Sequence, residues 1–293
     1  MITLSNGHTI EYVVASGALG FDGRGWPWER PLVWAGLIRP ELFTVVGKTV
    51  TLDPHPGNLR WWKPWECIRP LPGGGWVNKV GLTNPGFDWW CRKIGPRINR
   101  KKINFVCSIH GNRKELVEMT KRLNGFKLAA IEVDVSCPNI RHEDETAKTI
   151  VGDVNAVCWV SRHPVIVKVS VDQDYLAVTR GLEGIAEAID LNAVLWETIF
   201  PDVKSPLSKL QARVGGGGGG VSGRPAQKHN WAAAKALAEQ GSLPVIAPSI
   251  MEFADLARVR AQGASAVSFG AIHLLTPWKP TSIVRKDMQN AKR

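Results

Sequence analysis

The sequence lacks the features that mark membrane, secreted and disulfide-stabilised proteins. Its longest purely apolar runs are only a few residues, too short for a membrane-spanning helix. The N-terminus, MITLSNGHTIEYVV, has no basic start, apolar middle or small-residue cleavage site of a secretory signal. The 5 cysteines include no C-x-x-C pair, which disfavours a disulfide framework and a zinc or iron–sulfur site held by this chain alone. We therefore expect a cytoplasmic protein with reduced thiols, no metal site and no membrane contact.

Acidic residues are the scarcer charge, with 26 Asp and Glu against 37 Lys and Arg, a formal net charge of +11. Such a balance promotes contact with anions, including nucleic acid, phosphates and acidic proteins, without saying which. The basic side chains concentrate between Arg92 and Arg122, beside a tryptophan-rich stretch: Trp61, Trp62, Trp65, Trp76, Trp89 and Trp90. This pattern is compatible with a solvated face, a nucleotide-stacking surface, a partner interface or a flap over a pocket.

No internal repeat and no Ser/Pro-rich linker divides the 293 residues. Hydrophobic residues make up 44% and charged residues 22%, values typical of soluble globular chains, which excludes disorder, a coiled coil and a collagen-like fibre. The length allows one large domain or two small ones.

Short β-branched runs alternate with stretches that carry apolar residues at helical spacing. The predicted strands are Thr9–Ala15, Phe43–Val46, Ile103–Ile109, Ala130–Ser136, Val165–Ser170, Ala193–Leu195, Val245–Ala247 and Ala266–Phe269. The predicted helices are Lys114–Leu123, Ala147–Val160, Thr179–Ile189, Gln227–Glu239 and Glu252–Gln262. Apolar strands alternating with helices indicate a parallel sheet. The pattern predicts an α/β fold, a single (β/α)8 TIM barrel over residues 1–293, with a doubly wound sheet as the alternative.

Two segments fall outside this alternation. Residues 51–90, rich in Trp, Pro and Gly, are too long for an ordinary connection, so we interpret them as an insertion after the second strand that forms a lid or substrate loop. The run Gly215–Gly220 is predicted to be a loop after the sixth strand.

Polar or small residues follow the apolar runs of the predicted strands, at the rim where a barrel carries its chemistry. They are Ser16, Lys48, His110, Cys137, Lys168, Glu197, Thr198, Ser249 and Gly270. Their recurrence at equivalent positions predicts an active site.

Seven stretches, in this order, point to one family. They are ASGALGFDG (15–23), GKTVTLDPHPGN (47–58), NKVGLTNPG (78–86), VSCPN (135–139), VIVKVS (165–170), GGVSG (219–223) and GASAVSFGA (263–271). Together they resemble the class 1 dihydroorotate dehydrogenases, FMN enzymes built on a (β/α)8 barrel. The resemblance implies oxidation of dihydroorotate to orotate, a step of pyrimidine biosynthesis, with hydride transfer to FMN.

The resemblance also implies roles for individual residues. To FMN it assigns Ser16, Gly17, Lys48, Lys168, Gly220, Ser222, Gly223, Ser249, Gly270 and Ala271. To the substrate it assigns Asn78, Val80, Gly81, Leu82, Asn139, Asp134, Glu197 and Thr198. Cys137 is implied to be the base that removes a proton from substrate carbon, and Lys48 to act beside flavin and substrate. A cysteine thiol, with an ordinary pKa of about 8.5, is a weak base at neutral pH unless its site lowers that pKa.

The sequence departs from the family in the pocket. Asp134 and Glu197 stand where amides are expected, and an ionised carboxylate can only accept hydrogen bonds. Pro248 and Ser249 replace a usual Gly-Gly pair, which removes one N–H donor. These changes predict a pocket that does not hold orotate in the ordinary family manner. A one-residue shift around LWETIF, which would leave Thr198 in the pocket, is the plainer alternative.

Two other functions stay open: the same scaffold acting on a different reduced ring, including a base in RNA, and a non-catalytic barrel. RNA is disfavoured because VSCPN, GGVSG and GKTVTL resemble the enzymes of free substrates. The family implies a homodimer. With no cluster-binding cysteine spacing here, an iron–sulfur cluster would belong to a partner. The ASGALGF and KTVTLDPHPGN forms favour the type that pairs with an iron–sulfur/FAD electron-transfer subunit.

Overall fold

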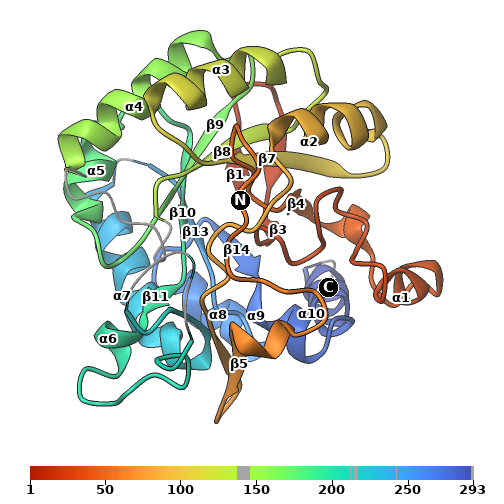
Figure 1. Ribbon diagram of the computed structural model, residues 1–293, viewed down its shortest axis with the longest axis vertical. Coiled ribbons are helices and arrows are strands. Elements are labelled where there is room, and N and C mark those ends of the chain that lie inside the picture. The colour runs from red at the N-terminus through yellow and green to blue at the C-terminus, as the bar shows by residue number, and fades with distance from the viewer. Residues whose placement is uncertain (137–145, 211–212, 214–216, 242, 292–293) are drawn as a thin grey trace.

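The computed structural model describes residues 1–136, 146–210, 213, 217–241 and 243–291 (Figure 1). Its centre is a closed barrel of parallel strands in the order β10-β13-β14-β3-β4-β7-β8-β9. The barrel strands are β3 (Tyr12–Val14), β4 (Thr44–Val46), β7 (Asn104–Ile109), β8 (Ala130–Asp134), β9 (Val165–Val169), β10 (Ala188–Leu191), β13 (Val245–Ala247) and β14 (Ala266–Phe269). Because the sheet closes on itself, the predicted (β/α)8 barrel is confirmed and the doubly wound alternative is wrong.

Helices surround the barrel, and Figure 1 shows α3, α4 and α5 along one side of it. The described helices are α1 (Arg30–Trp34), α2 (Phe87–Lys93), α3 (Arg113–Leu123), α4 (Ala147–Val160), α5 (Tyr175–Gly181), α6 (Trp196–Ile199), α7 (Arg224–Gln240), α8 (Ala254–Arg260), α9 (Ala271–Leu275) and α10 (Lys279–Asn290). Three 3₁₀ turns, η1 (Pro40–Leu42), η2 (Pro64–Glu66) and η3 (Gly95–Arg97), lie in the connections. Capping boxes begin α3 at Asn112 and α4 at Thr146, which satisfies N–H groups that a helix start leaves without partners.

A small hairpin covers the amino-terminal end of the barrel. Its strands β1 (Ile2–Thr3) and β2 (Thr9–Ile10) pair antiparallel. Ile2 and Ile10 belong to one buried cluster with Ala130, Ala188 and Ala266, the first residues of three barrel strands. The polar residues that follow the strands lie at the opposite, carboxyl-terminal rim.

A second, antiparallel sheet lies beside the barrel, in the order β11-β12-β6-β5. Its strands are β5 (Ile68–Leu71), β6 (Gly75–Asn78), β11 (Val194–Leu195) and β12 (Gly220–Gly223). The first two form a hairpin within residues 51–90, and Asn78 pairs with Gly220 across β6 and β12. The β5–β6 hairpin is therefore attached to β12, at the end of the glycine run.

The sixth predicted strand was wrong. The barrel strand is β10, whereas Val194–Leu195 forms β11 in the second sheet. The segment AIDL of β10 contains a buried acid, Asp190, which interrupts the apolar pattern that indicates a barrel strand. The predicted helix Thr179–Ile189 ran into β10 for the same reason.

Two other predicted boundaries also differ from the structure. The predicted first strand Thr9–Ala15 divides into β2 and β3, and the end of the predicted glycine loop, Gly220, opens β12. The described cysteines, Cys67, Cys91, Cys107 and Cys158, are free thiols, as expected. No helix in the described part of the chain is long and apolar enough to cross a membrane.

The tryptophan-rich stretch serves two purposes. Trp90 is buried and stacks on Phe87, so part of the stretch belongs to the core. Trp61, Trp62 and Trp65 are exposed. The exposed part keeps the partner-interface interpretation open.

Candidate active site at the carboxyl-terminal rim

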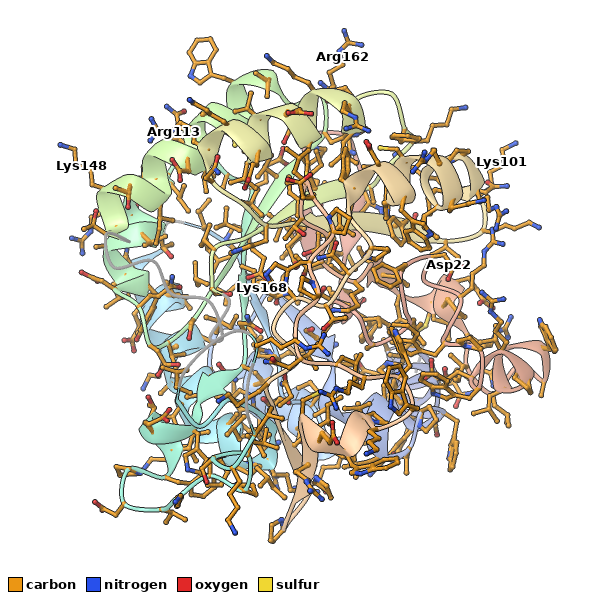
Figure 2. The ribbon with its side chains drawn as sticks, viewed as in Figure 1. Asp22, Lys101, Arg113, Lys148, Arg162 and Lys168 are labelled. Atoms are coloured by element: carbon orange, nitrogen blue, oxygen red, sulfur yellow. The ribbon has the colours of Figure 1, made fainter. Side chains whose placement is uncertain are left out.

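The barrel brings the predicted polar ring to one rim, because the carboxyl ends of parallel strands meet there. Ser16 follows β3, Lys48 follows β4, Ser249 follows β13 and Gly270 follows β14. Lys168 is the fourth residue of β9 and points into the barrel. Figure 2 shows Lys168 near the centre of the molecule, whereas Arg113 and Arg162 lie on its outer edge.

Lys168 is held by two buried carboxylates. Its Nζ lies 2.8 Å from Glu132 Oε1 and 3.0 Å from Asp190 Oδ2, and the Lys168 side chain is 5% exposed. Burial alone would lower the pKa of Lys168, but the charges of Asp190, Glu132 and Asp134 outweigh burial and raise it. Burial, partly offset by Lys168, raises the pKa of Glu132 to about 8. Within the barrel, the single ammonium group of Lys168 therefore lies near three acidic side chains, those of Glu132, Asp134 and Asp190, and cannot neutralise all of them.

A chain of hydrogen bonds joins this ion pair to the rim. Ser16 Oγ lies 3.0 Å from Thr49 Oγ1, which lies 2.9 Å from Ser108 Oγ. Ser108 donates to Glu132 Oε1 at 2.8 Å. Glu132 therefore connects Lys168 with a predicted cofactor-binding residue, Ser16.

Most of the residues in this network were not predicted from the sequence. Ser108, Glu132 and Asp190 each lie between apolar residues of a barrel strand: NFVCSI, AIEVD and AIDL. A buried polar side chain is costly unless it is paired, so a polar residue in each of several neighbouring strands was the signal that could have found the cluster.

Asp134 ends β8 with its carboxylate already hydrogen-bonded. Its Oδ1 accepts from Ser136 N at 3.1 Å and from Ser136 Oγ at 3.0 Å, and its Oδ2 lies 3.5 Å from Thr49 Oγ1. Asn192, directly after β10, donates through Nδ2 to Ser136 Oγ at 2.9 Å. Asn192 supplies an amide at the end of the sixth barrel strand, and the misplaced strand is why the sequence analysis did not find it.

The predicted substrate segment and the predicted phosphate segment are neighbours. Asn78 donates through Nδ2 to Gly220 O at 3.3 Å, in addition to the pairing of β6 with β12. Beyond Asn78 the chain turns sharply at Gly81 and Leu82, whose φ angles are 62° and 54°. A positive φ at a leucine is strained, and such strain concentrates at functional sites.

Gly223 stands where only glycine fits. Its φ is +87°, and a Cβ there would lie 2.8 Å from Gly74 O and 3.4 Å from the Cβ of Ala271. The two predicted phosphate segments, GGVSG and Gly270-Ala271, are therefore in contact. Gly223 precedes the 17-residue helix α7, which begins without a side-chain cap, unlike α3 and α4. Arg224 N, the first N–H of α7, donates to Gly74 O at 2.9 Å, and Pro225 has no N–H, so this helix start offers an anion fewer backbone donors than an ordinary one.

Ser249 adopts the left-handed backbone conformation that the family's usual glycine would adopt freely, with a φ of 72°. It is buried, and its carbonyl accepts from Gln227 Nε2 at 2.9 Å. The half-buried Lys48 runs along Gly17, where a Cβ would lie 3.5 Å from Lys48 Cγ. Ser16, Gly17 and Lys48 thus form one corner of the rim.

Glu197 and Thr198 lie on the short helix α6 and are exposed. The Glu197 carboxylate accepts from Gly218 N, and the Thr198 hydroxyl donates to Asp172. Both side chains are therefore engaged in loop contacts. Cys137 and Asn139 lie outside the described residues, which leave out 137–145.

Comparison with known proteins identifies one family. The family model described as dihydroorotate dehydrogenase matches residues 36–289. The chain is 34% identical over 278 residues to the dihydroorotate dehydrogenase B (NAD(+)) catalytic subunit of Desulforudis audaxviator, covering 90% of this chain and 83% of the relative. It is 30% identical over 244 residues to the protein of the same name from Bacteroides thetaiotaomicron, covering 80% of this chain and 76% of the relative.

A (β/α)8 barrel with a cationic, glycine-lined rim is a common scaffold for enzymes that act on phosphate-bearing ligands. The match over most of its length is more specific: this chain belongs to the dihydroorotate dehydrogenase family. It is an oxidoreductase of that family, whose enzymes depend on flavin.

Proposed function

We propose that this protein oxidises dihydroorotate to orotate with FMN as its resident cofactor, at the carboxyl-terminal rim of the barrel. The observation that carries the proposal is the pairing of Asn78 with Gly220, because it sets the substrate segment directly beside the phosphate segment in a member of this family.

The residues present suit FMN. The Ser222 hydroxyl and the neighbouring small residues Gly223, Gly270 and Ala271 line a place that a phosphate can approach closely, although the first N–H of α7 is already bonded to Gly74 O. Ammonium groups at Lys48 and Lys168 suit the carbonyl-rich edge of a flavin ring. Ser16, Gly17, Gly220 and Ser249 complete the lining that we assign to the cofactor. Bound FMN would supply the acceptor for the substrate hydride.

Lys168 is the cation that we place beside the ring. A lone buried ammonium would lose its proton readily, but Glu132 and Asp190 keep it charged. A fixed positive charge favours an anionic form of whatever lies against it. In this arrangement Glu132 and Asp190 position Lys168 and do not touch the substrate.

We assign the substrate to the segment from Asn78 through Val80, Gly81 and Leu82, and to the rim near Asp134, and the resemblance adds Asn139. Thr198 stays a candidate from the resemblance. Cys137 is the proposed base that takes the proton from substrate carbon, and Lys48 the proposed cation beside flavin and substrate. Residues 51–90 would act as the lid over this pocket.

The relatives named catalytic subunits suggest how electrons leave. We propose that a partner subunit carrying an iron–sulfur cluster and FAD accepts them, that the chain forms a homodimer, and that it acts in the cytoplasm. The exposed Trp61, Trp62 and Trp65 are available for such contacts.

The test is cofactor analysis followed by turnover. The purified chain should release FMN on denaturation, and it should convert dihydroorotate to orotate with an artificial electron acceptor. A protein that binds no flavin when titrated with FMN, or one that reduces its flavin only with another dihydropyrimidine, would contradict the proposal. The second result would favour the alternative that Asp134 raises, a substrate ring able to donate to a carboxylate.

A further inference from the structure

One peptide group, between Gly217 and Gly218, is held from both sides by charged side chains. Its carbonyl oxygen, Gly217 O, accepts from Lys79 Nζ at 2.8 Å. Its N–H, Gly218 N, donates to the carboxylate of Glu197. The cation thus lies at the negative end of the peptide dipole and the anion at its positive end. Hydrogen bonds with an ionised partner are roughly twice as strong as neutral ones.

Lys79 is buried, only 4% exposed, which is unusual for a lysine. Its backbone is fixed on both sides, since Lys79 N donates to Cys67 O at 2.8 Å and Lys79 O accepts from Asn58 Nδ2 at 2.8 Å. Its stem packs on Gly219, where a Cβ would lie 2.8 Å from Lys79 Cγ. The Lys79 side chain therefore extends along the end of the glycine run.

The other side of the run is fixed by α6 and the loop after it. Trp196 N donates to Gly219 O at 2.8 Å, and Ser205 Oγ donates to Gly218 O at 2.7 Å. Glycine loses more conformational freedom on ordering than any other residue. A segment entering a strand from a run of glycines needs contacts of this kind to hold one conformation.

The position of these contacts connects them with the site. Lys79 directly follows Asn78, the last residue of β6, and Gly219 directly precedes Gly220, the first residue of β12. The contacts therefore continue the β6–β12 pairing past the end of both strands.

We propose that Lys79 and Glu197 are positioning residues that clamp the Gly217–Gly218 peptide and so hold the substrate segment and the phosphate segment in register. The identity of the two ligands rests on the proposed function. The proposal gives Glu197, which the resemblance assigned to the substrate, a different task. It predicts that breaking the clamp weakens both ligands together.

The experiment compares Lys79→Met, Glu197→Ala and the double variant with the parent. Each single change should raise the FMN dissociation constant and the KM for dihydroorotate by roughly tenfold, the loss of one charge-assisted hydrogen bond. The kcat should change much less. The double variant should be little worse than either single variant, because both side chains act on one peptide group.

Conservative variants separate positioning from simple folding damage. Lys79→Arg and Glu197→Gln keep a donor and an acceptor and should recover most of the affinity for both ligands. Lys235→Met and Glu239→Gln remove the same charges from an exposed pair on α7 and should leave both constants unchanged.

A readout that needs neither ligand nor turnover is trypsin cleavage after Arg213. Arg213 N donates to Asn58 Oδ1 at 2.6 Å, and Asn58 in turn binds the backbone of Lys79. In the FMN-free protein, Lys79→Met and Glu197→Ala should be cut there faster than the parent and the α7 controls.

Three results would overturn the clamp. One is unchanged ligand constants and unchanged cleavage in Lys79→Met. Another is a lower melting temperature with both constants intact, which would make the contacts merely structural. The third is an effect of Glu197→Ala on dihydroorotate KM alone, as expected if Glu197 touched the substrate. Should the parent bind no FMN or fail to oxidise dihydroorotate, the proposed function fails, while cleavage after Arg213 still judges the clamp.

Discussion

Lys168 Nζ lies 2.8 Å from Glu132 Oε1 inside the barrel, and the two side chains are 5% and 1% exposed. The pair connects the rim to the core, since Ser108 joins Glu132 to the polar chain that reaches Ser16. Asp190 lies on the other side of the ammonium. Lys168 is therefore both a site residue and the neutralising charge of the barrel interior.

Lys168→Met should destabilise the fold as well as weaken the cofactor. It leaves the Asp190 carboxylate buried without its cation, whereas Glu132, with a pKa of about 8, keeps its proton at neutral pH; removing the partner of a buried charge in this way costs about 3–5 kcal/mol. Urea unfolding at neutral pH measures the loss. Lys148→Met, at an exposed lysine of α4, is the matched control, and adding Asp190→Asn to Lys168→Met should recover part of the loss. A stability equal to the control's would contradict the ion pair.

Glu132→Gln should change how stability depends on pH. Burial raises the pKa of Glu132 from 4.5 to about 8, so the folded protein keeps this proton in a range where the unfolded chain has lost it. Folding then binds a proton, and the free energy of unfolding falls as pH rises toward 8.

The clean window for this test is pH 6.5 to 8. Burial lowers the pKa of His273 from 6.5 to about 4, so its effect, a loss of stability as pH falls, lies below that window. The raised pKa of Lys168 acts only above its ordinary value of 10.5. Urea midpoints across the window should fall in the parent and stay nearly flat in Glu132→Gln. Parallel curves would show that Glu132 does not hold the proton.

Asp134→Asn should tighten the binding of orotate. An ionised carboxylate about 4 Å from an anionic ligand opposes it by about 4 kcal/mol at an effective dielectric near 20. Even a third of that is about tenfold in affinity. Equilibrium dialysis of orotate against the parent and Asp134→Asn measures the change, with Asp153→Asn on α4 as the control. If the parent binds orotate with micromolar affinity and Asp134→Asn binds it no more tightly, Asp134 does not determine which substrate is bound.

Cys137→Ala should slow flavin reduction by dihydroorotate by ~10² or more at neutral pH, the usual contribution of a general base. Cys137→Ser should regain activity only at high pH, because an alcohol is a much poorer base. Stopped-flow absorbance follows the reduction directly. Bleaching as fast in Cys137→Ala as in the parent would assign the proton to another residue.

The barrel and much of its rim could be predicted because their signals are local. VIVKVS shows a lysine in an apolar strand, and the glycines of GGVSG show where backbone must approach closely. The strand AIDL was missed because a buried aspartate is unexpected in a barrel strand. Asp190 is stable there because Lys168, on the neighbouring strand, supplies a positive charge. Lys79 was missed for the same reason. In the sequence it is one lysine of a loop, and its partner, Gly217 O, is far away along the chain.

Glu197 shows a different limit. Because Glu197 follows the predicted sixth strand, we expected its side chain to face the pocket. The barrel strand ends several residues earlier, and Glu197 instead lies in α6 and contacts Gly218. Sequence position fixes a side chain's direction only when the strand itself is placed correctly. Its role in substrate binding stays a prediction that the clamp variants also test.

The most direct test of the central claim is anaerobic single turnover. Purified, FMN-loaded protein mixed with dihydroorotate in the absence of any acceptor should lose its flavin absorbance and form one orotate per flavin. Flavin that stays oxidised under dihydroorotate, or bleaching without an equivalent of orotate, would contradict the assignment of this rim as a dihydroorotate-oxidising site.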